Sequence, residues 1–315
     1  MTQLLTRIDV PADVPSRQQG RYEENFQTMT KGTGRLMLFA GDQKVEHLND
    51  DFYGTLSNGD PIAEDDADPE HLFRIASEGI VGCFATQFGL IARYARDYPT
   101  VPYMVKLNSK SHLIKTSQRD PRSVAWVDVE DALRLQEAGV RVVGIGYTVY
   151  LGSEYESEQM REATQACIQA HERGLVATLW IYPRGAAVPE EQHPHIIAGA
   201  TGLATTLGAD FVKVNYPKVK EGSPAESFKE AVKAAGRTRV ITAGGSSTDE
   251  RKFLQTLHEQ IFISGAYGSA TGRNIHQKPL QQAVRMANAI SSITYGDYSV
   301  DDAMAVVEGR ADFKS

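Results

Sequence analysis

The chain has 315 residues, of which 41% are hydrophobic and 23% are charged, and this composition predicts one large domain that buries its core without disulfides or structural metals. The formal net charge of −7 excludes a global basic field of the kind that holds nucleic acid or an anionic membrane, so an anionic substrate needs a local pocket. Cys83 and Cys167 lack the spacing of a metal or redox motif, which favours a reducing, cytoplasmic compartment.

A polar N-terminal extension (1–34), without the apolar segment of an export signal, is followed by two alternating patterns. Short β-branched or apolar runs are each followed by a run with helical spacing, and the pair occurs eight times. Such repeats are typical of βα units around a parallel sheet. The predicted strands are 36–40, 80–85, 103–107, 140–146, 176–182, 211–215, 240–243 and 265–271. The clearest helices are 128–138, 154–173, 195–207, 224–235, 249–260 and 279–290.

Eight βα units of this length favour a single (β/α)8 TIM barrel over residues 1–315, rather than an open doubly wound sheet. Functional residues of a barrel lie at the C-terminal ends of the strands and in the loops that follow. The loop 49–69, close after the first strand, has seven acidic residues and no lysine or arginine. A loop of this length suggests an active-site lid or an oligomer contact, and a solvated insertion is the alternative.

Two lysines, Lys106 and Lys213, stand inside apolar strands, where burial of an ammonium group is costly. Desolvation and a second nearby cation favour the neutral amine, which can attack a ketone and form a Schiff base. The third and sixth strands would bring both lysines to one cavity. The alternative is a lysine at a strand end whose ammonium group extends into solvent.

Polar side chains also follow the first and fifth strands. Trp180, Tyr182 and Arg184 alternate along the fifth strand and therefore share one face. On that face the phenol can act as an acid or base, the indole can stack on a substrate or only pack, and the guanidinium can pair with an anion. Asp42 follows the first strand, where it can orient a hydroxyl or shuttle a proton, or cap the next helix.

Glycine-rich loops at 243–250 and 271–276 follow the last two strands. Glycine lets backbone N–H groups approach an anion, and the loops after strands seven and eight are the usual phosphate site of a barrel. Arg273 adds a charge-assisted hydrogen bond. These loops predict a phosphorylated substrate.

The segments GYTVYLGSE, LWIYPRG and GADFVKVNYP, with the AGG and GRN loops, resemble the archaeal-type class I fructose-bisphosphate aldolase family in order and spacing. This family belongs to the superfamily of deoxyribose-phosphate aldolase, and the resemblance covers residues 36 to about 286. It implies that Lys213 forms the Schiff base, Tyr182 donates and accepts protons, and Asp42 assists. Trp180 would line the site and Lys106 would lie beside the imine. The dihydroxyacetone-phosphate half would rest on Gly244, Gly245, Gly272 and Arg273.

The resemblance also implies a phosphorylated sugar partner, a homo-oligomer built as a pentamer or decamer, and no cofactor beyond the covalent Schiff base. No metal is predicted, because the protonated imine serves as the electron sink. The only suggestive pair, His193 and His195, is separated by Pro194 at a helix start and is expected to be exposed.

The sequence departs from the family where substrates are distinguished. The family commonly reads Asp-His-Gly or Asp-Gln-Gly where this chain reads Asp42-Gln43-Lys44, so Lys44 is expected near the substrate mouth. A bisphosphate needs a second cationic site, for which Lys110 and Arg184 are candidates. One alternative is therefore a related Schiff-base aldolase or transaldolase that acts on another phosphorylated ketose, such as an aminodideoxyheptulosonate-type synthase. Non-catalytic scaffolds and magnesium-dependent phosphatases are further alternatives.

Overall fold

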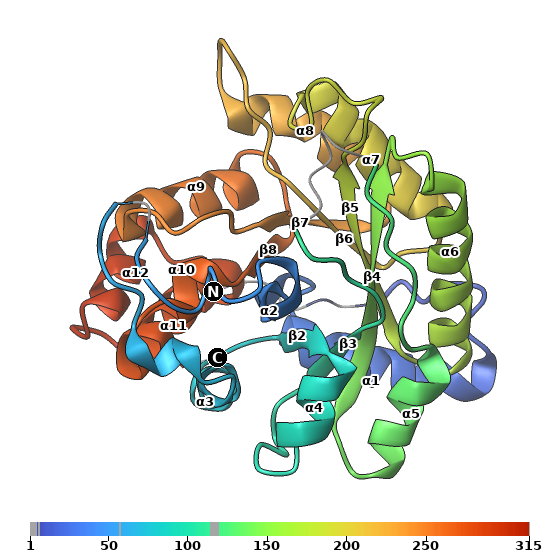
Figure 1. Cartoon of the computed structure of the whole chain (residues 1–315), viewed down its shortest axis with the longest axis horizontal. Coiled ribbons are helices and arrows are strands. Elements are labelled where there is room, and N and C mark those ends of the chain that lie inside the picture. The colour runs from blue at the N-terminus through green and yellow to red at the C-terminus, as the bar shows by residue number, and fades with distance from the viewer. Residues whose placement is uncertain (1–4, 6, 57, 114–119, 315) are drawn as a thin grey trace.

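The computed structural model describes residues 5, 7–56, 58–113 and 120–314, so positions 1–4 and 6 of the predicted extension and position 57 of the acidic loop lie outside the described residues. Eight parallel strands close into a barrel in the order β1 to β8, with helices around it (Figure 1). The predicted TIM barrel is confirmed. The strands are β1 (Leu36–Ala40), β2 (Cys83–Gln87), β3 (Tyr103–Lys106), β4 (Val142–Leu151), β5 (Val176–Pro183), β6 (Phe211–Val214), β7 (Arg239–Ala243) and β8 (Gly268–Thr271).

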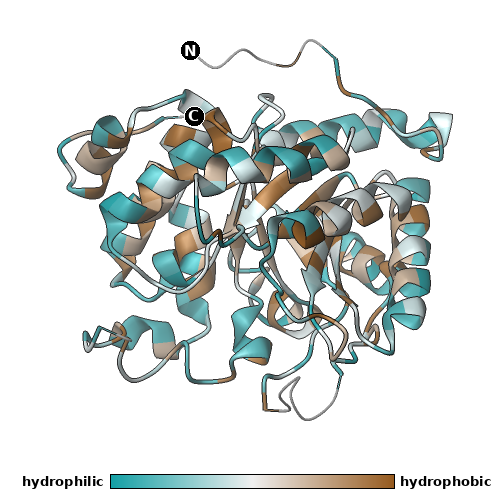
Figure 2. Cartoon of the chain, turned by 90° about the horizontal axis from the view of Figure 1, so that it is seen from above, coloured by the Kyte–Doolittle hydropathy of each residue, from teal (hydrophilic) through white to brown (hydrophobic). Residues whose placement is uncertain are grey.

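The helices follow the strands as the alternating pattern predicts, with additional short turns in the loops. The outer helices combine hydrophilic and hydrophobic residues (Figure 2). The helical elements are η1 (Ser16–Gln18), α1 (Gln19–Thr30), α2 (Gln43–Glu46), η2 (Glu64–Ala67), α3 (Glu70–Glu78), α4 (Phe88–Tyr94), α5 (Val129–Glu137), α6 (Glu156–Glu172), α7 (Pro194–Thr206), α8 (Pro224–Ala234), α9 (Glu250–Phe262), α10 (Arg273–His276), α11 (Leu280–Gly296) and α12 (Val300–Val307). Within the described part of the chain, no helix is long and apolar enough to span a membrane.

Three strands differ clearly from the sequence prediction, and one of them, β8, begins at Gly268 rather than at position 265. β4 continues to Leu151 instead of ending at Gly146, because residues 147–151 pair in register with 179–183 of β5. β2 begins at Cys83 rather than at position 80, since the backbone N–H of Ile80 donates to the side chain of Asn288 on α11. The longer β4 extends the barrel wall beside the C-terminal mouth.

The N-terminal extension covers the opposite end of the barrel. Its helix α1 was not predicted, because most of its surface is polar, yet Tyr22, Phe26 and Met29 are buried. The ring of Phe26 stacks on Phe211 of β6, with ring centroids 5.5 Å apart. The extension therefore closes the N-terminal end of the barrel and leaves the C-terminal mouth accessible.

A buried polar cluster joins this extension to the barrel. His171 lies 2.8 Å from an oxygen of Asp13 and 3.1 Å from an oxygen of Asp210. Asp210 also accepts a hydrogen bond from the Tyr22 hydroxyl (2.5 Å) and one from the backbone N–H of Ala177 (2.7 Å). Burial lowers the pKa of His171, but the two carboxylates outweigh it and raise the pKa to about 9.

Stability is expected to depend on the charge of His171. Because its folded pKa lies above the ordinary 6.5, the stabilisation is fully present below about pH 6.5 and is lost as the pH rises through about 9. A shift of this size corresponds to about 3 kcal/mol, reduced somewhat because Asp13 is partly exposed. Urea unfolding at pH 6, 7.5 and 9.5 should show His171→Gln losing most at pH 6 and least at pH 9.5. A pH-independent difference would contradict the charged cluster.

Candidate active site

The two predicted lysines meet at the C-terminal half of the barrel. Lys106 ends β3 and Lys213 lies on β6, and the two residues are 1% and 5% exposed. Trp180 of β5 pairs in register with Lys213 and is fully buried. The Nζ atoms of Lys106 and Lys213 lie 4.1 and 5.3 Å from the centre of the Trp180 ring. One indole therefore supports both amines, and neither lysine extends its side chain into open solvent.

Gly146 of β4 provides the space for this arrangement. A Cβ atom at this position would lie 2.5 Å from a ring carbon of Trp180 and 2.9 Å from Cδ of Lys106. The sequence analysis did not predict this role for Gly146. The feature that could have indicated it is a glycine inside an otherwise apolar strand. Two residues further on, the Thr148 hydroxyl accepts a hydrogen bond of 2.5 Å from Lys106 Nζ. β4 thus leaves space for the Lys106 side chain at Gly146 and orients its amine through Thr148.

The environment of Lys106 holds its pKa below the ordinary value. Burial has the largest effect and lowers the pKa of Lys106, and the charge of Lys213 lowers it further. The carboxylates of Asp42 and Glu46 raise it, and the resulting pKa is about 8. Lys106 is therefore an amine that exchanges its proton near neutral pH, next to a second lysine.

Two carboxyl groups from the first βα connection face the lysines. Asp42 precedes α2 but its side chain makes no capping hydrogen bond, so the helix-cap interpretation is wrong. It is 1% exposed, and neither carboxylate oxygen has a hydrogen-bond partner among the described residues. Burial and the nearby Asp42 charge raise the pKa of Glu46, while Lys106 and Lys213 oppose the increase. Such a pair can hold a proton close to the amines.

Tyr182, at the end of β5, lines the same cavity as Lys213. Its ring lies 6.4 Å from that of Tyr150, and the Arg184 guanidinium lies 5.7 Å from its centre. Burial, followed by the charges of Glu46 and Asp42, raises the pKa of Tyr182 well above its ordinary value. The phenol therefore keeps its proton at neutral pH.

The four predicted phosphate-binding residues lie together at one side of this cavity. The two glycine-rich loops are held to each other by Asn274, whose amide donates to the carbonyl oxygens of Gly244 (2.9 Å) and Ser246 (3.2 Å). Gly245 has a φ of +69°, a conformation that glycine adopts without strain. The residues of this group are Gly244, Gly245, Gly272 and Arg273.

The candidates for a second anion site lie beside the two tyrosines. Arg184 lines the cavity and pairs with Glu191 at 3.1 Å. Lys110 lies nearby, with its Nζ 5.7 Å from the Tyr150 ring centre. Lys44 is not in this group, which corrects the prediction. Its ammonium group turns to the acidic loop, where it lies 3.9 Å from the Phe52 ring centre, because α2 turns this side chain out of the cavity.

Sequence reasoning did not select several other residues of the cavity. Asn215 directly follows β6, at the C-terminal end of a strand where functional residues of a barrel are expected, so the sequence could have indicated it. His112 lies in a loop whose path cannot be predicted from the sequence. The additional polar residues that line the cavity are Gln43, Glu46, His47, His112, Tyr150 and Asn215.

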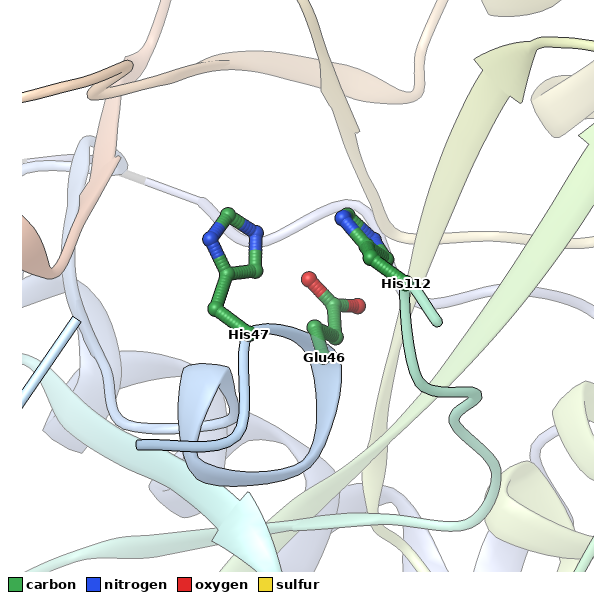
Figure 3. Close-up of side chains that lie close together, drawn as sticks. All are labelled: Glu46, His47 and His112. Atoms are coloured by element: carbon green, nitrogen blue, oxygen red, sulfur yellow. The ribbon is translucent and has the colours of Figure 1, made fainter. Parts of the chain in front are cut away.

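Three of these side chains could be considered for a metal ion. Donor atoms of Glu46, His47 and His112 lie within 4.8 Å of one another (Figure 3). Burial, His47 and the neighbouring cations Lys110 and Arg184 lower the pKa of His112 to about 4. The positive charges near His112 disfavour binding of a divalent cation and favour binding of an anionic or hydroxyl-rich ligand. His195, considered in the sequence, has an 80% exposed side chain beside Glu230.

Paired amines at the floor of a barrel, with a protonated phenol on one side and anion-binding loops on the other, are the parts of a lysine-dependent aldolase. A family model supports this class: residues 36–278 match the DeoC/LacD family aldolases, and the chain belongs to that family.

Curated relatives cover nearly the whole chain. One is the fructose-bisphosphate aldolase/6-deoxy-5-ketofructose 1-phosphate synthase of Methanocaldococcus jannaschii, 56% identical over 96% of this chain and 95% of the relative. Another is the class 1 fructose-bisphosphate aldolase of Thermoproteus tenax, 34% identical over 87% of this chain and 94% of the relative.

Solved structures agree with this assignment. The fructose-bisphosphate aldolase from Slackia heliotrinireducens superimposes with a TM-score of 0.95 at 55% identity, covering 98% of this chain and 96% of that chain. An archaeal fructose-1,6-bisphosphate aldolase, solved with its catalytic lysine bound to the carbinolamine intermediate, gives a TM-score of 0.73 at 32% identity over 87% of this chain and 100% of that chain.

Proposed function

We propose that the protein is a class I aldolase that cleaves fructose 1,6-bisphosphate to dihydroxyacetone phosphate and glyceraldehyde 3-phosphate, and catalyses the reverse addition. The observation that carries the proposal is the position of Lys213, which lies at the cavity floor with Tyr182 and both glycine-rich loops around it. The curated relatives with fructose-bisphosphate aldolase names support this substrate class.

In this proposal the amine of Lys213 attacks C2 of the ketose and forms a carbinolamine, which loses water to give a protonated imine. Departure of hydroxide needs an acid, and the buried pair Asp42 and Glu46 supplies the proton. Lys106 stays beside the imine on the same indole ring, where its hydrogen bond to the Thr148 hydroxyl fixes its position.

Tyr182 is proposed as the group that exchanges a proton with the C4 oxygen. In the addition direction the neutral phenol donates to the aldehyde oxygen as the C3–C4 bond forms. In cleavage the phenolate accepts the C4 hydroxyl proton, and the iminium charge on Lys213 offsets the carboxylates that disfavour phenolate. Tyr182, now protonated, then donates its proton to C3 of the enamine, and hydrolysis of the imine frees dihydroxyacetone phosphate.

The bisphosphate assignment rests on two groups of cations at the cavity, Arg273 in one and Arg184 with the nearby Lys110 in the other. We propose that the phosphate next to C1 binds the glycine-rich loops and Arg273, and that the C6 phosphate binds Arg184 with Lys110. The ion pair between Arg184 and Glu191 would have to loosen or share its guanidinium with the phosphate. A homo-oligomer built on pentamers, a cytoplasmic location and catalysis without a metal also remain proposals.

A second candidate is a transaldolase or related Schiff-base aldolase acting on another phosphorylated ketose. The name of the Methanocaldococcus jannaschii relative includes a 6-deoxy-5-ketofructose 1-phosphate synthase activity, which favours this alternative. Both candidates share the C1 phosphate and the Lys213 chemistry, and they differ only at the aldehyde side of the cavity.

Borohydride trapping tests the proposal. The native protein is incubated with fructose 1,6-bisphosphate or with dihydroxyacetone phosphate, reduced, and analysed by intact-mass spectrometry, while released glyceraldehyde 3-phosphate is followed with a coupled dehydrogenase. We expect an adduct with each sugar and release of the aldehyde only from the bisphosphate. Trapping of dihydroxyacetone phosphate without cleavage of the bisphosphate would favour the second candidate. Failure to trap either sugar would refute the Schiff-base chemistry.

A further inference from the structure

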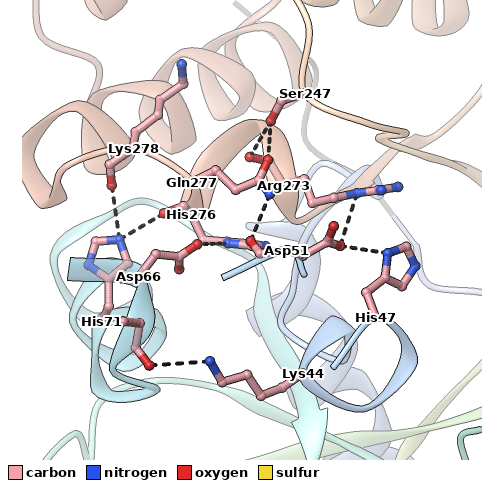
Figure 4. A network of polar contacts seen from close by, with 11 residues as sticks. Lys44, His47, Asp51, Asp66, His71, Ser247, Arg273, His276, Gln277 and Lys278 are labelled. Carbon is pink, nitrogen blue, oxygen red and sulfur yellow. Dashed lines mark hydrogen bonds and ion pairs between the residues drawn. The ribbon is translucent and has the colours of Figure 1, made fainter. Parts of the chain in front are cut away.

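The acidic loop 49–69 is attached to the segment that carries Arg273. Asp66 and His276 form a fully buried hydrogen-bonded pair at 2.7 Å, and the Phe52 ring stacks on His276 with centroids 4.8 Å apart. The Gln277 amide donates to the backbone oxygen of Asp51 at 2.8 Å (Figure 4). These contacts contradict a solvated insertion. The anchored residues 51, 52 and 66 form a wall beside the phosphate end of the cavity, while residues 53–55 and 58–61 of the loop are exposed.

Asp51 is the loop residue that reaches the site. One carboxylate oxygen lies 2.8 Å from His47 Nδ1 and 3.6 Å from Arg273 Nε (Figure 4). Burial opposes ionisation, but the His47 ring and the Arg273 guanidinium outweigh it and lower the pKa of Asp51. The carboxylate is therefore ionised at neutral pH and joins two side chains that line the cavity.

The contact with Arg273 uses Nε, which leaves the two terminal nitrogens of the guanidinium available for an anion. A free arginine side chain has many rotamers, and ordering it when a ligand binds reduces affinity. A carboxylate that holds Nε removes part of this cost before the ligand arrives. Its charge also repels a phosphate, but the contact at Nε leaves the opposite edge of the guanidinium for the phosphate.

We propose that Asp51 is a positioning residue that fixes Arg273 for the phosphate of the substrate, with the Asp66–His276 pair anchoring the loop that presents it. This assignment gives the acidic loop a role in affinity for phosphorylated ligands. It rests on the proposed function only in the identity of the sugar, because any ligand with a phosphate at this end would depend on Asp51 in the same way.

The test compares Asp51→Asn with Asp50→Asn, a matched control that removes the neighbouring exposed acid. For Asp51→Asn we expect KM for the phosphorylated ketose to rise about three- to tenfold, with kcat within about twofold. The inhibition or dissociation constant of inorganic phosphate should rise by a similar factor, and Asp51→Glu should restore part of the affinity. Asp50→Asn should match the native protein in each measurement.

A double-mutant cycle with Arg273→Lys separates positioning from a general loss of structure. Lysine keeps the charge but has no Nε to hold, so Asp51→Asn should have little further effect in this background. Phosphate affinity that is unchanged or tighter in Asp51→Asn would overturn the proposal, as would an equal effect in both backgrounds. Phosphate binding is measured by calorimetry without turnover, so failure of the proposed aldolase substrate would leave this result interpretable. If Asp51→Asn does not fold, Asp51→Glu in the native and Arg273→Lys backgrounds gives the same comparison.

Discussion

Lys213→Ala is expected to lower kcat/KM for aldol cleavage by at least about 1000-fold, because the variant has no amine that can form the imine on which bond cleavage depends. The pocket itself should persist, since Trp180 and Lys106 retain their contact and the phosphate loops are held by other residues. The measurements are steady-state cleavage and the mass of the borohydride-reduced protein with dihydroxyacetone phosphate. Both the adduct and the activity should disappear together.

Lys106 is the residue that could form the imine in place of Lys213, because it is a second buried amine beside the Trp180 ring with a pKa of about 8. Lys106→Met should weaken catalysis but keep an adduct, and peptide mapping should place that adduct on Lys213. Lys220→Ala, which removes a lysine with a 93% exposed side chain, serves as the control. An adduct that persists in Lys213→Ala and maps to Lys106 would show that the catalytic lysine has been assigned incorrectly.

The barrel and much of the cavity could be predicted because both depend on local sequence patterns. Alternating strand and helix periodicity defines the βα units. Because functional residues of a barrel lie at the C-terminal ends of its strands, this pattern then indicates Lys213, Tyr182 and the glycine-rich loops. Asp42 also follows the end of a strand, but whether its side chain caps a helix or enters the cavity depends on packing. The structure decides this point, because the carboxylate is buried without a capping bond.

Other parts could not be predicted because they depend on contacts between distant segments. The Asp66–His276 pair joins residues 210 positions apart, and together with the contacts of Phe52 and Asp51 it shows where the acidic loop is attached to the barrel. Lys44 was misplaced because its direction depends on the short helix α2 and on Phe52, which lies within that insertion. Gly146 was missed because its role is to leave space, and space becomes visible only when Trp180 and Lys106 have been placed.

Tyr182→Phe is expected to separate the two halves of the reaction. The variant loses only the hydroxyl group and keeps the ring beside Tyr150. Imine formation on Lys213 needs no proton from this phenol, so trapping of dihydroxyacetone phosphate should continue. Cleavage and addition should both slow by about 100- to 10,000-fold, the range typical of a lost general acid or base.

Tyr98→Phe is the matched control, since it removes a hydroxyl that donates to Glu70 at 2.8 Å on the outside of the barrel. If Tyr182→Phe instead lost adduct and turnover together, the phenol would be required before the carbon–carbon bond changes. If turnover stayed within tenfold of the native rate, the proton at the C4 oxygen would have to come from another group. Glu46 would then be the leading candidate, because burial beside Asp42 raises its pKa and places a proton in the same cavity.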